Sequence, residues 1–254
     1  MTGRIASLWR HPVKGFTPER LAEATLTAGG FFPCDRIYAV EDGPSGFDPA
    51  APAWITKQKF TVLAKIAEVA RARTAYDETS GVLSVSADGR EPLCAPLKKA
   101  KGREAFAAWL SAFLGEAASG PLKVVEAPGH RFTDHPRGEV SIVNLASVRD
   151  LEARVGRPID PLRFRANLYV EGWPAWIENH AKAREVNLGP VTARVFSSIV
   201  RCAATHVDPT TGERDMDLVG ALHANYGHML CGVYVSILEG GRIGEGDAAE
   251  IRPV

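Results

Sequence analysis

The chain has 254 residues, of which 45% are hydrophobic and 24% are charged, a composition typical of a folded globular protein. Thirty Lys and Arg residues balance thirty Asp and Glu residues, so the net charge excludes a general attraction to nucleic acid or anionic lipid. No apolar run approaches the roughly 18 residues that cross a bilayer, and the N-terminus MTGRIASLWRHP lacks the apolar stretch of a signal peptide. We therefore expect a cytoplasmic protein that binds neither nucleic acid nor a membrane.

The sequence gives little support to a disulfide-stapled protein, a zinc site or a nucleotide-binding fold. The four cysteines are sparse and none forms a CxxC pair, so we expect free thiols. The seven histidines form no HExxH motif. The chain also has no Walker loop and no GxGxxG after a strand, which leaves ATP and dinucleotides without a local binding motif.

Short apolar stretches separated by turns fill the first half of the chain. Gly, Pro and Asp punctuate them, which is typical of antiparallel β-structure. We predict strands over residues 4–10, 21–26 and 37–40, and a hairpin of 69–76 with 82–87 joined through 77–81.

Two helices are predicted in the middle of the chain. The first carries a stripe of apolar residues at helical spacing, formed by Phe106, Trp109, Leu110, Phe113 and Leu114, and ends at Gly115. The second is expected to begin at Ser147, whose hydroxyl is placed to cap the backbone, and to end at Gly156. Between them, the polar stretch 127–139 is typical of a surface loop or a flap.

The second half returns to strands. Residues 164–170 alternate in polarity, so Arg165 is expected to face away from the apolar side of its strand. Residues 191–199 predict another strand, and residues 233–238 are expected to pair with the segment from Arg242 onward. We therefore predict a mainly β protein with some helices, built as a closed or nearly closed barrel.

One stretch of the second half carries a recognisable motif. The segment RCAATHVDPTTG, residues 201–212, resembles the RCxxTxVDPxTG signature of MOSC domains, which are named after the C-terminal domain of molybdenum cofactor sulfurases and also occur in the mitochondrial amidoxime-reducing component. Four further stretches match motifs of that family in the same order, namely His11–Gly15, Asp35–Arg36, Phe164–Asn167 and Ile243–Asp247. The resemblance implies an α+β fold with a MOSC-type β-barrel and an N-terminal β-barrel-like subdomain. It places the N-terminal domain at residues 1–120 and the MOSC domain at residues 121–254.

The resemblance implies that Cys202 is the protein ligand of molybdenum in a molybdopterin cofactor (Moco). A thiolate suits a soft or borderline metal that offers one open position, and the cation of Arg201 next to it favours the thiolate. Without the surrounding motif, an isolated cysteine is more commonly a small buried apolar side chain. Neither Cys34, Cys94 nor Cys231 lies in such a motif, so none of these three is expected to bind the metal.

Three basic residues, Lys14, Arg36 and Arg165, fall in the matching motifs and are predicted to bind the cofactor together with Arg201. A terminal phosphate and a polar pterin edge need cations and planar donors, so we expect these side chains to converge on the Cys202 sulfur. The alternative for each is an ordinary surface ion pair.

The resemblance also suggests three further site residues. Asn144 stands where the amidoxime-reducing relatives have a polar pterin contact, and its alternative role is to shape the turn before a helix. Tyr226 precedes a glycine as in a cofactor-approaching YG pair of those relatives, although aromatic-glycine pairs are common in loops. Glu178 lies near an acidic stretch of the relatives and is a candidate proton donor.

The function implied by the resemblance is a molybdenum cofactor-dependent oxidoreductase that reduces N-hydroxylated small molecules. The chain has no room for the iron–sulfur domain or the pyridoxal-phosphate domain of some relatives, so we expect an external electron-donor protein. Two departures from the family pattern, Gly15 and Val200 in place of serines, remove hydroxyls and mildly favour a non-catalytic carrier of the cofactor or a sulfur-handling protein. A metal-free β-barrel that binds ligands or serves as a scaffold is the third possibility.

Overall fold

An eight-stranded sheet closes on itself in the computed structural model, which describes residues 1–137 and 139–252. Closure results from the pairing of the first strand with β10 as well as with β15, and β2 lies outside the ring. In sheet order the strands are β10 (Leu168–Glu171), β9 (Val140–Asn144), β13 (Leu230–Glu239), β12 (Val191–Val200), β11 (Glu185–Leu188), β15 (Ala248–Ile251), β1 (Thr2–Arg10) and β2 (Glu19–Leu21). The predicted fold class, mainly β with a closed barrel and some helices, is confirmed.

The interior of this barrel is filled by alternate residues of its strands. On β12, Val191, Ala193 and Val195 are at most 1% exposed, while the intervening Arg194 faces solvent. This period of two is the pattern that a strand with one buried face requires. The same core includes Ile5 of β1, so the beginning of the chain is built into the barrel.

The remaining strands form three small sheets beside the barrel. The pairs and triplet are β3 (Glu23–Leu26) with β14 (Gly241–Gly244), β4 (Ala39–Asp42) with β8 (Leu122–Val125), and β5 (Arg73–Asp77) with β6 (Val82–Ser86) and β7 (Leu93–Pro96). The predicted hairpin is the β5–β6 pair. Because β1 and β3 both pair with strands of the second half, strand pairing crosses the expected division at residue 120, and that division stays a prediction.

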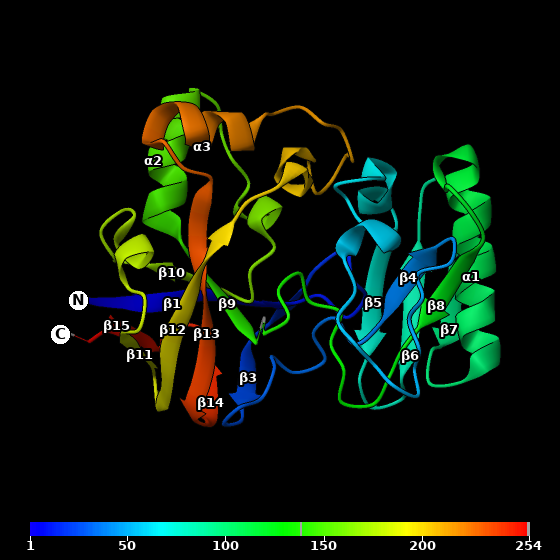
Figure 1. Ribbon diagram of the computed structural model, residues 1–254, viewed down its shortest axis with the longest axis horizontal. Coiled ribbons are helices and arrows are strands. Elements are labelled where there is room, and N and C mark those ends of the chain that lie inside the picture. The colour runs from blue at the N-terminus through cyan, green and yellow to red at the C-terminus, as the bar shows by residue number, and fades with distance from the viewer. Residues whose placement is uncertain (138, 253–254) are drawn as a thin grey trace.

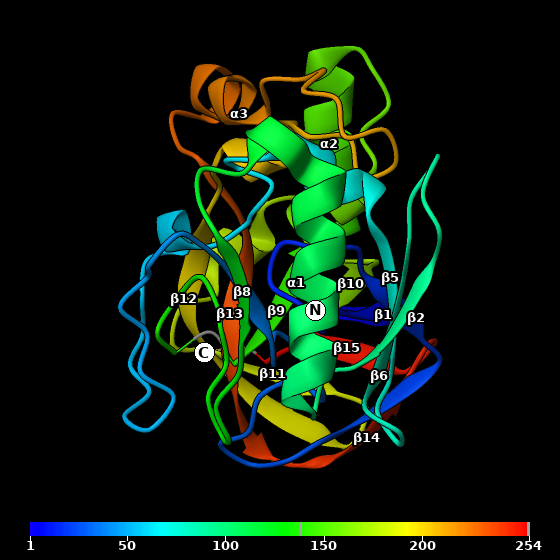
Figure 2. The same ribbon diagram turned by 90° about the vertical axis from the view of Figure 1, so that its right-hand side faces the viewer.

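Helix α1 (Ala100–Leu114) covers the β4–β8 and β5–β6–β7 sheets on the side away from the barrel (Figure 1) and lies in front of them in Figure 2. Phe106, Leu110 and Leu114 of the predicted stripe are buried, and Gly115 ends the helix with a φ of 53°. Trp109 and Phe113 are partly buried at the edge of the same core. The apolar spacing therefore predicted the buried face, although the helix begins several residues earlier than the stripe.

Helices α2 (Leu145–Val155) and α3 (Leu218–Tyr226) cover one end of the barrel (Figure 1). The predicted cap of α2 was wrong, because the side chain of Asn144 accepts from the backbone of Ala146 and Ser147 lies inside the first turn. The predicted end at Gly156 is confirmed, with φ at 72°. No helix within residues 1–137 and 139–252 has the length and apolar character needed to cross a membrane.

Short 3-10 turns replace some of the predicted strands. They occupy Lys57–Lys59, Ala67–Arg71, Gly115–Ala117, Pro161–Phe164, Ile177–His180 and Ala203–His206. The prediction of one strand over 164–170 was wrong, since Asp160 caps a turn that ends at Arg165 in the left-handed region and the strand begins at Leu168. The prediction that residues from Arg242 onward pair with 233–238 was also wrong, because β14 pairs with β3.

Candidate functional site

A pocket of about 300 Å³ lies where the barrel meets the smaller sheets. Its walls come from both halves of the chain, including the loop after β1, the segment 133–135, the turn before β10 and the end of β12. Lys14, Arg36, Arg165, Arg201 and Cys202 all line it, so the predicted convergence of the basic residues on the cysteine is confirmed.

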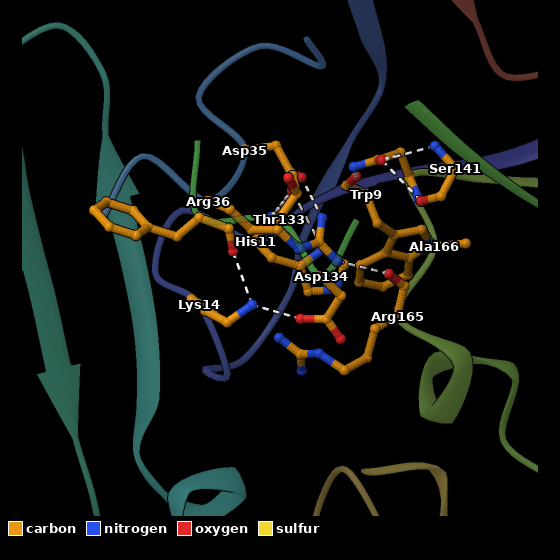
Figure 3. Close-up of polar contacts among 12 residues, drawn as sticks. Trp9, His11, Lys14, Asp35, Arg36, Thr133, Asp134, Ser141, Arg165 and Ala166 are labelled. Carbon is orange, nitrogen blue, oxygen red and sulfur yellow. Dashed lines mark hydrogen bonds and ion pairs between the residues drawn. The ribbon is translucent and has the colours of Figure 1, made fainter. Parts of the chain in front are cut away.

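Lys14 reaches the pocket from the loop after β1. Its side chain is only 3% exposed, donates to the carbonyl oxygen of Phe132 at 2.9 Å and forms an ion pair with Asp134 (Figure 3). Burial lowers the pKa of Lys14 although Asp134 opposes the shift. The ammonium is thus held at the pocket wall by one carbonyl and one carboxylate.

The neighbouring Gly15 fixes the backbone that presents Lys14. Its φ is 90°, and a Cβ at this position would lie 2.5 Å from the carbonyl oxygen of Thr61. Both observations require glycine. The backbone of this loop therefore explains the glycine that stands where the family motif has a serine.

Arg36 also lines the pocket and is held by an ion pair with the buried Asp35. Its guanidinium bonds Asp35 and donates from Nη2 to the backbone oxygen of Arg165 at 2.9 Å. Asp35 also accepts from the backbone N–H of His11 at 2.7 Å, and although burial opposes its ionisation, Arg36 keeps the pKa of Asp35 well below the usual range. Burial lowers the pKa of His11 to about 3, so this neighbour is neutral.

Arg165 lines the pocket beside Arg36, and Asp134 and Asp35 act on its charge without a direct ion pair among the described residues. It adopts a φ of 52°, which turns its side chain into the pocket, and its Nη2 donates to the backbone oxygen of Phe16 at 2.7 Å. No carboxylate among the described residues lies within salt-bridge distance of it. Burial and the positive charge of Arg36 lower the pKa of Arg165 to about 10. An anionic ligand would relieve this repulsion.

Cys202 precedes the turn Ala203–His206 and follows Arg201, the first residue after β12. Lys57 donates from Nζ to its Sγ at 3.1 Å. The other cysteines are absent from the pocket lining: Cys94 is exposed on β7, and Cys231 is fully buried, which raises the pKa of its thiol to about 12. Among the described cysteines, only Cys202 is available to a ligand in this pocket.

Arg201 holds two backbone segments of the site together through hydrogen bonds to their carbonyl oxygens. Its Nε donates to the backbone oxygen of Cys231 at 2.7 Å, and its Nη1 donates to that of Phe164 at the same distance. The guanidinium also lies 5.2 Å from the Phe164 ring. These contacts tie the turn before Arg165 to the strand end that carries Cys202.

The structure does not bring Asn144, Glu178 or Tyr226 into this pocket. Asn144 and Glu178 form a buried cluster beneath α2, in which Glu178 accepts from Ser147 at 2.7 Å and from Asn144 at 3.0 Å. Burial raises the pKa of Glu178, but its two oxygens are already hydrogen-bonded within this cluster. Asn144 therefore has the turn-forming role that was its alternative, and Glu178 is not among the residues that line the pocket.

Tyr226 lies at the end of α3. Its hydroxyl donates to Asp150 at 2.7 Å and its ring lies 4.4 Å from that of Trp176. Burial and the Asp150 carboxylate raise its pKa to about 12. It ties α3 to α2.

Lys57 and Asp134 also line the pocket, although no motif in the sequence marks them. Asp134 accepts from Lys57 at 3.1 Å and forms the ion pair with Lys14, so it joins two loops across the pocket. Burial opposes the charge of Lys57, but Asp134 and Cys202 outweigh it and raise the pKa of the ammonium. The only signal in the sequence was the polar character of residues 127–139, which indicated a loop or flap without singling out Asp134.

Comparison with known proteins adds family evidence to this geometry. The molybdenum cofactor sulfurase of Caenorhabditis elegans is 32% identical over 132 residues, which are 50% of this chain and 18% of that protein. Mitochondrial amidoxime-reducing component 1 of Homo sapiens is 25% identical over 248 residues, which cover 83% of this chain and 68% of that protein. The chain thus spans less than a fifth of the sulfurase. The YUAD protein from Bacillus subtilis, a solved structure, is 12% identical with a TM-score of 0.47 over 98% of this chain and 94% of that one.

Two family models match the sequence without overlap. The MOSC N-terminal beta barrel domain matches residues 2–118, and the MOSC domain matches residues 129–250. Together they span nearly the whole chain. They include Cys202 and all the Lys and Arg residues that line the described pocket. The chain therefore belongs to the family of proteins that join a MOSC N-terminal beta barrel domain to a MOSC domain.

Proposed function

We propose that this chain binds molybdopterin-bound molybdenum through Cys202 and acts as an oxidoreductase that reduces N-hydroxylated small molecules with electrons from an external protein. The observation that carries the proposal is the pocket in which Cys202 shares the walls with Lys14, Arg36 and Arg165. The named relatives, a molybdenum cofactor sulfurase and an amidoxime-reducing component, support the cofactor and the reaction class.

The residues present fit such a cofactor. Six cationic side chains line the described pocket. They are Lys14, Arg36, Lys57, Arg163, Arg165 and Arg201. Arg36 is paired with Asp35, and Arg163 with Asp208 and Asp215. The other four still outnumber Asp134, the single carboxylate among the described lining residues, an excess that favours a phosphate-bearing anion. In the part of the chain that the structure describes, no group of three His, Cys, Asp or Glu side chains is placed to hold a metal by itself. A metal at Cys202 would take its remaining ligands from a bound organic group.

The basic residues and Cys202 would contact different parts of the cofactor. Arg165 and Lys14 would hold the phosphate and polar edge of the cofactor, and Cys202 would supply the one protein sulfur. Lys57 brings a positive charge to 3.1 Å from that sulfur, which stabilises negative charge there. Bound molybdenum supplies two-electron chemistry that removes oxygen from an N–O bond.

The experiment that tests the reaction uses the full chain produced in a host that synthesises the cofactor. Supplied with a strong artificial reductant, the loaded protein is expected to reduce a benzamidoxime probe, and nicotinamide cofactor alone is expected to support no turnover. Loaded protein that turns over no N-hydroxylated compound yet passes its cofactor to a cofactor-free molybdoenzyme would establish the carrier instead. Protein that acquires no molybdenum in such a host would favour a metal-free binding role.

A further inference from the structure

Asp134 is the one acidic side chain among the described residues that line the pocket. Its carboxylate forms an ion pair with the buried Lys14 and accepts from Lys57 at 3.1 Å. Figure 3 shows Lys14 and Arg165 extending toward Asp134 from different segments of the chain. The carboxylate thus stands among the cations that an anionic ligand would need.

The charges around Asp134 remain unbalanced. Burial disfavours the charged form, yet Lys14, Lys57 and Arg36 together hold the pKa of Asp134 well below its usual range, so it carries a full negative charge. The single carboxylate of Asp134 faces Lys14, Lys57 and Arg165. A phosphate monoester carries up to about two negative charges and three acceptor oxygens, and it matches this set better than a carboxylate does.

The segment that carries Asp134 is held at its two ends by the core and in between by side-chain contacts. Phe132, 4% exposed, packs against Phe47 and Phe60 with ring centroids at 4.9 and 5.6 Å, and Val140 begins β9. Residues 133–137 contain no helix or strand. Beyond Asp134 they are held by side chains: the His135 ring lies 5.5 Å from that of Phe196, and Arg137 donates to Ser236 at 3.2 Å and lies 4.8 Å from the Phe196 ring. Outward movement of Asp134 would therefore break side-chain contacts of residues 133–137, whereas Phe132 and β9 lie outside the part that moves.

We propose that Asp134 is an internal counter-ion that occupies the anion subsite of the pocket, and that the phosphate monoester of an incoming ligand displaces it from Lys14 and Lys57. Ligand binding then moves residues 133–137 outward. The identity of that ligand as the cofactor rests on the proposed function. The displacement itself depends only on the phosphate chemistry of the ligand.

The test uses inorganic phosphate as the probe and the full chain purified without cofactor. Calorimetry is expected to show that Asp134→Asn binds phosphate about tenfold more tightly than the native chain, which corresponds to removal of about 1.4 kcal/mol of competition. Asp88→Asn removes the same charge from an exposed turn and is the matched control, expected to bind phosphate like the native chain. Equal or weaker phosphate binding by Asp134→Asn would overturn the proposal.

A second measurement needs no variant. Phosphate is expected to accelerate tryptic cleavage of the native chain after Arg137, because displacement of Asp134 frees residues 133–137. A cleavage rate that phosphate leaves unchanged or lowers would also overturn the displacement.

Molybdenum content separates this inference from the proposed function. A native chain that acquires no molybdenum in a cofactor-producing host, together with tighter phosphate binding by Asp134→Asn, would refute the cofactor and uphold the counter-ion. Normal molybdenum content without any gain in phosphate affinity would uphold the cofactor and refute the counter-ion.

Discussion

Replacement of Asn144 by alanine separates a structural role from a cofactor contact. The side chain is fully buried, and its Oδ1 accepts from the backbone N–H of Ala146 at 3.0 Å at the start of α2. Its Nδ2 donates to Glu178 at 3.0 Å and to the backbone oxygen of Pro174 at 2.8 Å. Asn144→Ala therefore removes a helix cap and leaves the buried Glu178 carboxylate and the exposed Pro174 carbonyl short of a donor.

The expected loss of stability follows from these contacts. Loss of an N-cap costs about 1 kcal/mol. A buried polar group left without its donor costs about 1–3 kcal/mol more, and Glu178 is only 1% exposed. We expect Asn144→Ala to lower the free energy of unfolding by about 2–4 kcal/mol.

Urea unfolding of the cofactor-free chain measures this loss. Asn225→Ala is the matched control, because Asn225 is exposed on α3 and bonds only to the backbone of Ala221, so a change within about 0.5 kcal/mol is expected. An Asn144→Ala protein as stable as the control would refute the reasoning. If such a stable variant also lost its cofactor, Asn144 would be a cofactor contact as the family resemblance suggested.

Two further predictions concern the pocket wall. Gly15→Ser is expected to destabilise the protein by at least about 2 kcal/mol more than Gly29→Ser. Both positions have positive φ, but only at Gly15 would a Cβ meet the Thr61 carbonyl. Thermal unfolding compares the two variants, and equal losses of stability would contradict the steric explanation. Asp35 has a pKa held below its usual range by Arg36 against the opposing effect of burial, so it stabilises the fold above about pH 4 and loses that contribution as the pH falls further. Asp35→Asn is therefore expected to lose less stability than the native chain between pH 5 and pH 3 in urea titrations, and a parallel loss in both proteins would refute the assignment.

Periodicity and turn chemistry predicted the parts of the fold that depend on neighbours in the sequence. The stripe ending in Leu114 became the buried face of α1, and the run from Val191 became a barrel strand with alternate residues inside. These patterns report which face of an element is buried. They do not report which strands meet, and so the pairing of β14 with β3 escaped prediction.

The site was predictable where family motifs marked it. Cys202, Lys14 and Arg165 lie in such motifs and share one pocket. The alternating pattern at 164–170 nevertheless failed, because the left-handed conformation of Arg165 breaks the strand in a way that residue polarity does not reveal.

Lys57 and Asp134 could not be found from the sequence in the same way. Each lies in a loop or short turn without apolar periodicity, and each contributes to the pocket only because the fold brings distant segments together. Glu178 and Asn144 show the opposite failure. Their residue types suit catalysis, yet the fold pairs them with each other beneath α2.

The central claim is that Cys202 is the protein ligand of molybdenum. Its most direct test is the molybdenum content per chain of Cys202→Ser, with the exposed Cys94→Ser as control, both produced in a host that synthesises the cofactor. We expect Cys94→Ser to match the native chain and Cys202→Ser, folded to the same degree by circular dichroism, to lose most of its molybdenum. Full molybdenum content in Cys202→Ser, or its loss in Cys94→Ser alone, would contradict the claim.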